Sequence, residues 1–126
     1  MKVLDYKDKN YFIEHLVFQI NDPDKIEEWI DLDHEMWTRY IAGKQGFVSK
    51  EVWVNDFNPG EVQTVICFES LNILSAIDRN EWAEMDLEFH ERFSGEFKIT
   101  RRIHKENHLK LYKARHYQLI DEDDLK

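Results

Sequence analysis

The chain has 126 residues, of which 42% are hydrophobic and 34% are charged, and its formal net charge is −9. This length fits one domain with one core, and the apolar content is too high for a disordered chain. The negative charge argues against a protein that coats nucleic acid, because phosphate backbones would repel it. No stretch has the pattern of a signal peptide or the length of a membrane span, so we expect one cytoplasmic domain over residues 1–126.

The first elements of the chain have clear local signals. Residues 11–20 are rich in β-branched and aromatic side chains and predict a strand. Asp22 is a candidate N-cap and Pro23 suits the first helical position, so we expect a helix over 23–42 that stops at Gly43.

A hairpin follows this helix. Gly46 is expected to make the turn into a second strand over 47–55, and residues 56–60 have the composition of a turn. Residues 61–70 predict a third strand, which would pair with the second.

The last third of the chain adds a helix and a strand. Ser70 can cap a short helix over 71–80, and apolar residues at helical spacing predict a second helix over 81–93. The segment 97–115 is strand-like, and residues 108–115 are its strongest strand candidate.

The predicted order β-α-β-β-α-β is the ferredoxin-like α+β plan, an antiparallel four-stranded sheet with both helices on one face. We place the core at about residues 11–115 and an acidic C-terminal tail at 119–126. All three of the first strands carry large apolar side chains on both of their faces, and two helices can cover only one face. The other face is therefore expected to pack against a second copy of the chain, forming a homodimer.

One run of residues resembles the first-helix and second-strand signature of small proteins in the dimeric α+β barrel superfamily: Asp33, Trp37, Gly46, Phe47, Lys50 and Trp53. That superfamily includes antibiotic-biosynthesis monooxygenase-like proteins and haem-degrading monooxygenases. The resemblance implies a dimeric α+β barrel, but this fold hosts many activities and does not define one.

The first helix contains one residue that does not fit its amphipathic pattern. At 100° per residue, Asp33 falls at the centre of the apolar stripe, and His34 falls on its shoulder. A carboxylate there needs hydrogen-bond partners, or its pKa rises until it is neutral. Either outcome suits a general acid or base, or a ligand anchor, although a purely structural Asp is the alternative. His34 is a candidate ligand-binding residue at the rim, and solvation is its alternative role.

The polar partners of Asp33 depend on which sheet face looks at the helices. If the mixed polar and apolar face does, His15, Gln19 and Trp53 line one pocket with Asp33, with Trp37 as an apolar wall. We favour this arrangement, in which Asp33 and His15 handle a proton. If the mixed face instead meets the partner copy, His15 and Glu51 become interface residues.

Other chemistries find little support. A haem-degrading relative would show an Asn on the first strand and a Trp followed ten residues later by a His on the second helix. Here Trp82 and His90 are eight residues apart, and the first strand offers Gln19 or His15.

Metal and nucleophile sites are also not expected. The pairs His104/His108 and Asp86/His90 lack further ligands. Cys67 lies in an apolar run, and no phosphate-binding glycine loop is present. We therefore predict no metal and no cofactor.

The segment 98–115 holds seven Lys or Arg residues against one acid, Glu106. It could bind an anionic ligand, or its charges could complement the acidic helices or face solvent.

Two functions remain. The first is a cofactor-independent monooxygenase-like or isomerase-like enzyme acting on a small aromatic molecule in a pocket around Asp33. The second is a non-catalytic homodimer that binds a small ligand or another protein.

Overall fold

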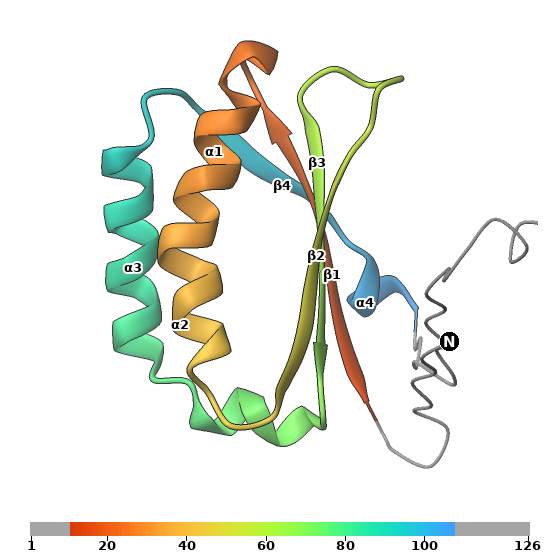
Figure 1. Ribbon diagram of the computed structural model, residues 1–126, viewed down its shortest axis with the longest axis vertical. Coiled ribbons are helices and arrows are strands. Elements are labelled where there is room, and N and C mark those ends of the chain that lie inside the picture. The colour runs from red at the N-terminus through yellow and green to blue at the C-terminus, as the bar shows by residue number, and fades with distance from the viewer. Residues whose placement is uncertain (1–10, 108–126) are drawn as a thin grey trace, which may run out of the picture.

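A computed structural model describes residues 11–107, which form a four-stranded sheet with helices (Figure 1). The strands are β1 (Phe12–Ile20), β2 (Phe47–Val54), β3 (Glu61–Phe68) and β4 (Phe97–Arg102). They lie in the order β2-β3-β1-β4, and every neighbouring pair is antiparallel. This is the ferredoxin-like arrangement that the order of predicted elements indicated.

The first helical region runs from Pro23 to Ala42 in four consecutive pieces: a 3₁₀ turn (Pro23–Lys25), α1 (Ile26–Asp33), a π-helical segment (His34–Thr38) and α2 (Arg39–Ala42). The Oδ1 atom of Asp22 accepts a hydrogen bond from the backbone N–H of Asp24, which confirms the predicted cap. The π-helical segment is a feature that the sequence pattern did not predict.

The second helical region begins with a 3₁₀ helix (Leu71–Ala76), whose cap, Ser70, accepts a hydrogen bond from the N–H of Asn72. The main helix is α3 (Arg79–Arg92), which starts two residues earlier than predicted because Asp78 caps it. A short helix, α4 (Ile103–Glu106), follows β4.

Within residues 11–107 the last strand lies at the start of the strand-like segment predicted over 97–115. Residues 97–102 form β4, because Phe97 and Ile99 pack into the core while the intervening Lys98 is exposed. The candidate segment 108–115 lies outside the described residues, as does the acidic tail.

Helices α1, α2 and α3 cover one face of the sheet, and α4 lies on the other side (Figure 1). The main core fills the space between α1, α3 and the sheet, and comprises Phe18, Ile20, Trp29, Leu32, Met36, Val62, Phe89 and Phe93. A smaller cluster at the other end of the helix layer contains Ile41, Ile66, Phe68 and Ile73. The alternate positions of β1 that face the helices are therefore Glu14, Leu16, Phe18 and Ile20.

Candidate active site between the helices and the sheet

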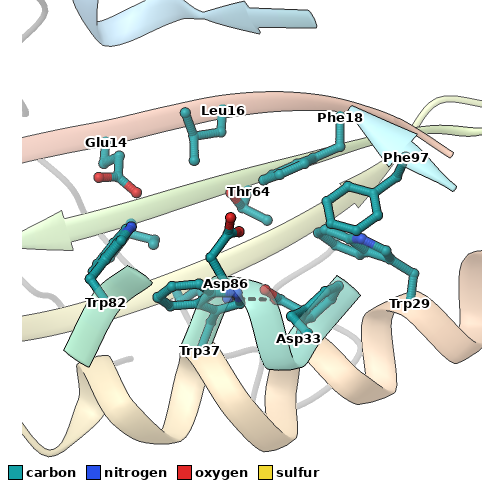
Figure 2. Close-up of a pocket in the computed structure, with 13 residues that line it drawn as sticks. Glu14, Leu16, Phe18, Trp29, Asp33, Trp37, Thr64, Trp82, Asp86 and Phe97 are labelled. Carbon is teal, nitrogen blue, oxygen red and sulfur yellow. Dashed lines mark hydrogen bonds and ion pairs between the residues drawn. The ribbon is translucent and has the colours of Figure 1, made fainter. Parts of the chain in front are cut away.

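A cavity of about 90 Å³ lies between the helix layer and the sheet, where the core is incomplete. Its wall is mostly aromatic and aliphatic, and it also carries four charged side chains. Glu14 and Trp82 lie at one end, and Trp29 and Phe97 lie at the other, with Asp33 between them (Figure 2). The full lining is Glu14, Leu16, Phe18, Trp29, Asp33, Trp37, Lys50, Thr64, Ile66, Trp82, Asp86, Phe89 and Phe97.

Asp33 and Lys50 form a buried ion pair in this wall. The Nζ atom of Lys50 donates a hydrogen bond of 2.6 Å to Oδ2 of Asp33 and one of 2.8 Å to Oγ1 of Thr38. The two charged side chains are only 5% and 6% exposed. Burial raises the pKa of Asp33, while the charge and the hydrogen bond of Lys50 act in the opposite direction.

The π-helical segment explains how one ammonium group reaches both helix residues. Asp33 and Thr38 are five residues apart, and in a regular helix of 3.6 residues per turn they would point about 140° away from each other. In the π-helical segment the backbone N–H of Arg39 donates to the carbonyl oxygen of His34, five residues earlier. This wider turn brings Thr38 round towards the side of Asp33, so that both oxygens face Lys50.

The register of the sheet places Glu14 beside this ion pair. Glu14 on β1 and Lys50 on β2 are both paired with Ile66 of β3, so the three residues form one row across the sheet. Burial raises the pKa of Glu14, and the positive charges of His104, Lys50, Lys105 and Arg102 oppose this rise without cancelling it.

The second helix closes the cavity. Trp82 and Asp86 come from α3, and the Trp82 ring lies 4.5 Å from the ring of Trp37, centroid to centroid. The side chain of Asp86 is 57% exposed and lies 3.7 Å from His90, so this wall borders solvent. The arrangement can hold a small flat molecule between aromatic rings and a set of charged groups.

The structure brings only two of the six predicted site residues together. Asp33 and Trp37 line the cavity, whereas His34 is exposed and does not contribute to its wall. The expectation that His15, Gln19 and Trp53 share a pocket with Asp33 is wrong, because the more apolar positions of the strands face the helices. These three residues lie on the opposite sheet face.

The positions on the opposite face have their own contacts. Nε2 of His15 lies 2.7 Å from Oε1 of Gln63, and the amide of Gln19 donates to the carbonyl of Pro59. Trp53 is 59% exposed.

Sequence reasoning missed Glu14, Lys50, Trp82 and Asp86 as site residues. A signal for two of them was present, since Glu14 and Lys50 each interrupt an otherwise apolar set of alternate positions in their strands. A polar residue in an apolar strand face and another in an apolar helix face are natural partners. Asp33 and Lys50 form that pair.

The described residues contain no group of three or more His, Cys, Asp or Glu that could hold a metal ion. Within the same residues, no helix is both long enough and apolar enough to cross a membrane.

The sheet order and the helix–sheet cavity define an α+β protein of the ferredoxin-like class, and two solved structures share its fold. A conserved protein from Methanosarcina mazei Go1 is 16% identical with a TM-score of 0.51, covering 77% of this chain and 97% of its own. A putative antibiotic biosynthesis monooxygenase from Caulobacter crescentus CB15 is 13% identical with a TM-score of 0.51, covering 72% of this chain and 86% of its own. No protein-family model and no curated protein matches the sequence. The likeness therefore shows that the chain shares the fold of these two proteins.

Proposed function

We propose that the protein is a cofactor-independent, isomerase-like or monooxygenase-like enzyme that acts on a small aromatic molecule in the helix–sheet cavity. One observation carries this proposal: the same cavity has two tryptophan rings in contact, Trp37 and Trp82, and a buried Asp33–Lys50 ion pair. Aromatic rings bind flat apolar ligands, and the charged groups supply proton chemistry.

The ion pair supports a functional role because stability alone does not require it. Replacing a buried ion pair by apolar residues of similar volume is often neutral or stabilising. Lys50 uses two of its three N–H donors on Asp33 and Thr38, and among residues 11–107 the third has no acceptor, so it can bind a ligand. In a poorly hydrated cavity, such a donor stabilises negative charge that develops on a ligand oxygen during the reaction.

The fold is compatible with this proposal without specifying the reaction. The word monooxygenase belongs to the Caulobacter crescentus protein, which is 13% identical to this chain. The proposed proton chemistry therefore rests on the side chains of the cavity.

Binding of mono- and bicyclic aromatic compounds, followed by tryptophan fluorescence, tests the proposal. We expect binding to the wild type and to Trp53→Leu, a matched control on the other sheet face, and weaker binding to Trp82→Leu. Asp33→Asn is expected to remove turnover of any compound that the wild type converts. If Trp82→Leu and Trp53→Leu bind every compound equally well, the cavity is not the site.

A second candidate function is non-catalytic binding of a small ligand or of another protein. It is favoured by the pairing of Asp33 with Lys50, which gives the carboxylate a structural role as well. The test is a compound that binds in the cavity, measured in D₂O. If it takes up no deuterium and is not converted, the result supports non-catalytic binding against the enzymatic function.

We also propose that the protein forms a homodimer through the sheet face opposite the helices. The support is apolar exposure on that face of β2 and in the turn after the strand: Trp53 is 59% exposed and Phe57 is 99% exposed. Exposed apolar patches of this kind are typical of protein interfaces. A sedimentation mass close to that of one 15.4 kDa chain would refute the dimer.

A further inference from the structure

We propose that Glu14 is the residue that exchanges a proton with the ligand, and that Asp33 is a positioning residue that holds Lys50. This inference rests on the proposed function and assigns roles within the same cavity. It moves the proton chemistry from the pair Asp33 and His15, which the sequence favoured, to a carboxyl group on β1.

Asp33 is poorly placed to act as a base. Its Oδ2 atom accepts the 2.6 Å hydrogen bond from Lys50, and the same ammonium group is fixed by Thr38. Taking a proton from a ligand would break this ion pair in a site where both side chains are almost fully buried. His15 is excluded more simply, because it lies on the other face of the sheet.

Glu14 has the features that Asp33 lacks. Its side chain lines the cavity (Figure 2), and no hydrogen bond or ion pair joins its carboxyl group to another residue within 11–107. Pairing between β1 and β4 starts only at Leu16, so Glu14 lies just beyond the end of β4. Burial of a carboxyl group without a partner favours its protonated form, and a ligand that donates a hydrogen bond would satisfy the carboxylate.

The positive groups that act on Glu14 come from three elements. Lys50 on β2, Arg102 on β4, and His104 and Lys105 on α4 all lower its pKa through their charges. Asp33 and Asp86 contribute the other carboxylates of the cavity. Burial outweighs the four positive groups and raises the pKa of Glu14, so this carboxyl group can both donate and accept a proton closer to neutral pH than an exposed glutamate.

The row across the sheet gives the two groups complementary roles. Glu14 and Lys50 flank Ile66, about two strand spacings or roughly 10 Å apart at their backbones, with their side chains on the cavity side. A small uncharged molecule between them could place an oxygen against the free N–H of Lys50 and a C–H or O–H bond against Glu14. The Glu14 carboxylate takes the proton and the bonding electron pair stays on the ligand, where Lys50 stabilises it. The protonated Glu14 then returns the proton to the same or a different atom.

Phenyldiazomethane tests the assignment on the whole wild-type chain, because it is a small aromatic reagent that esterifies protonated carboxyl groups. The carboxyl proton moves to the diazo carbon, N₂ leaves, and the carboxylate oxygen bonds to the benzyl carbon. We expect peptide mass spectrometry near neutral pH to find the benzyl ester at Glu14 and much less at Glu51, a matched glutamate that is exposed on β2. Label on Glu51 but not on Glu14 would overturn the proposal.

The pH at which labelling of Glu14 falls to half tests the role of Asp33. Asp33→Asn leaves the charge of Lys50 unbalanced, so the midpoint should move to lower pH. Lys50→Met removes that charge, so the midpoint should move to higher pH. Shifts of the same sign, or no shift in either variant, would contradict the positioning role.

The result is separable from the proposed function. If aromatic compounds bind in a Trp82-dependent manner while Glu14 stays unlabelled, the assignment of Glu14 fails and the cavity remains the binding site. If Glu14 is labelled but no aromatic compound binds, the proposed function fails instead.

Discussion

The Lys50→Met substitution gives the sharpest test of how the Asp33–Lys50 ion pair contributes to the fold. Lys50 donates hydrogen bonds to Asp33 and Thr38, and no other residue within 11–107 donates a hydrogen bond to the Asp33 carboxylate. Removing one partner of a buried ion pair costs about 3–5 kcal/mol, because the remaining charge is buried without compensation. We therefore expect the free energy of unfolding to fall by about 3–5 kcal/mol.

Urea unfolding followed by circular dichroism measures this loss. With an m-value of about 2 kcal/mol/M, the midpoint should fall by roughly 2 M. Lys98→Met is the matched control, because Lys98 is an exposed strand lysine whose replacement should change stability by no more than about 0.5 kcal/mol. The double variant Asp33→Asn/Lys50→Met should recover much of the loss, since it leaves no buried charge.

The pH dependence of Lys50→Met follows from the same reasoning. Without Lys50, burial is opposed only by the smaller effect of His34, so the pKa of Asp33 rises further above the unfolded value. The folded state then binds the proton more tightly than the unfolded state, so the cost of the substitution should decrease as the pH falls through that raised pKa. If Lys50→Met and Lys98→Met have the same urea unfolding midpoint at neutral pH, Asp33 is not left as a buried, uncompensated carboxylate and the reasoning is refuted.

Four further predictions follow from the described residues. The raised pKa of Glu14 means that its proton stabilises the folded state at low pH, so the wild type should lose stability relative to Glu14→Gln as the pH rises from about 4.5 through that pKa; a difference that is constant with pH would contradict this. Thr38→Val removes an acceptor of the charged Lys50 and should cost about 1.5–3 kcal/mol in urea unfolding, whereas Thr38→Ser, which keeps the hydroxyl, should cost less. Burial raises the pKa of the Cys67 thiol to about 11, so the native protein should resist iodoacetamide at pH 8 and react only after denaturation; rapid native alkylation would show that the thiol is accessible. Gly60 has φ +91°, and an added Cβ would lie 2.4 Å from the carbonyl oxygen of Ile20. Gly60→Ala should therefore lower the free energy of unfolding by at least about 2 kcal/mol in thermal or urea unfolding, and a stability equal to wild type would mean that the turn rearranges freely.

Much of the fold could be predicted from local chemistry. Asp22, Pro23 and Ser70 mark helix starts because capping depends only on neighbouring backbone groups, and the structure bears out all three. Gly46 adopts φ +97° in the turn before β2, a conformation that favours glycine. The burial of Asp33 was also predictable, because helical periodicity alone places it in the apolar stripe.

The partner of Asp33 was not predictable in the same way, because it depends on which face of the sheet meets the helices. A bulge in β2 separates the pair Phe47–Phe68 from the pair Ser49–Cys67, so strict alternation along this strand is interrupted. Phe47 pairs with Phe68, and Lys50 pairs with Ile66; Phe68 and Ile66 belong to the same core cluster. Phe47 and Lys50 therefore lie on the same sheet face, although one has an odd and the other an even residue number. Counting alternate residues from the sequence therefore gave two mixed faces and no clear choice between them.

The π-helical segment at His34–Thr38 also has a consequence for how this helix could change. A π turn accommodates one residue more than a regular turn, so deletion of a single residue within it would restore a continuous α-helix. Asp33 and Thr38 would then be four residues apart in a regular helix, about 40° from each other, so both side chains would still face Lys50. The wider turn therefore absorbs the rotation of about 100° that an added residue would otherwise cause, and α2 keeps its place on the sheet despite the extra residue.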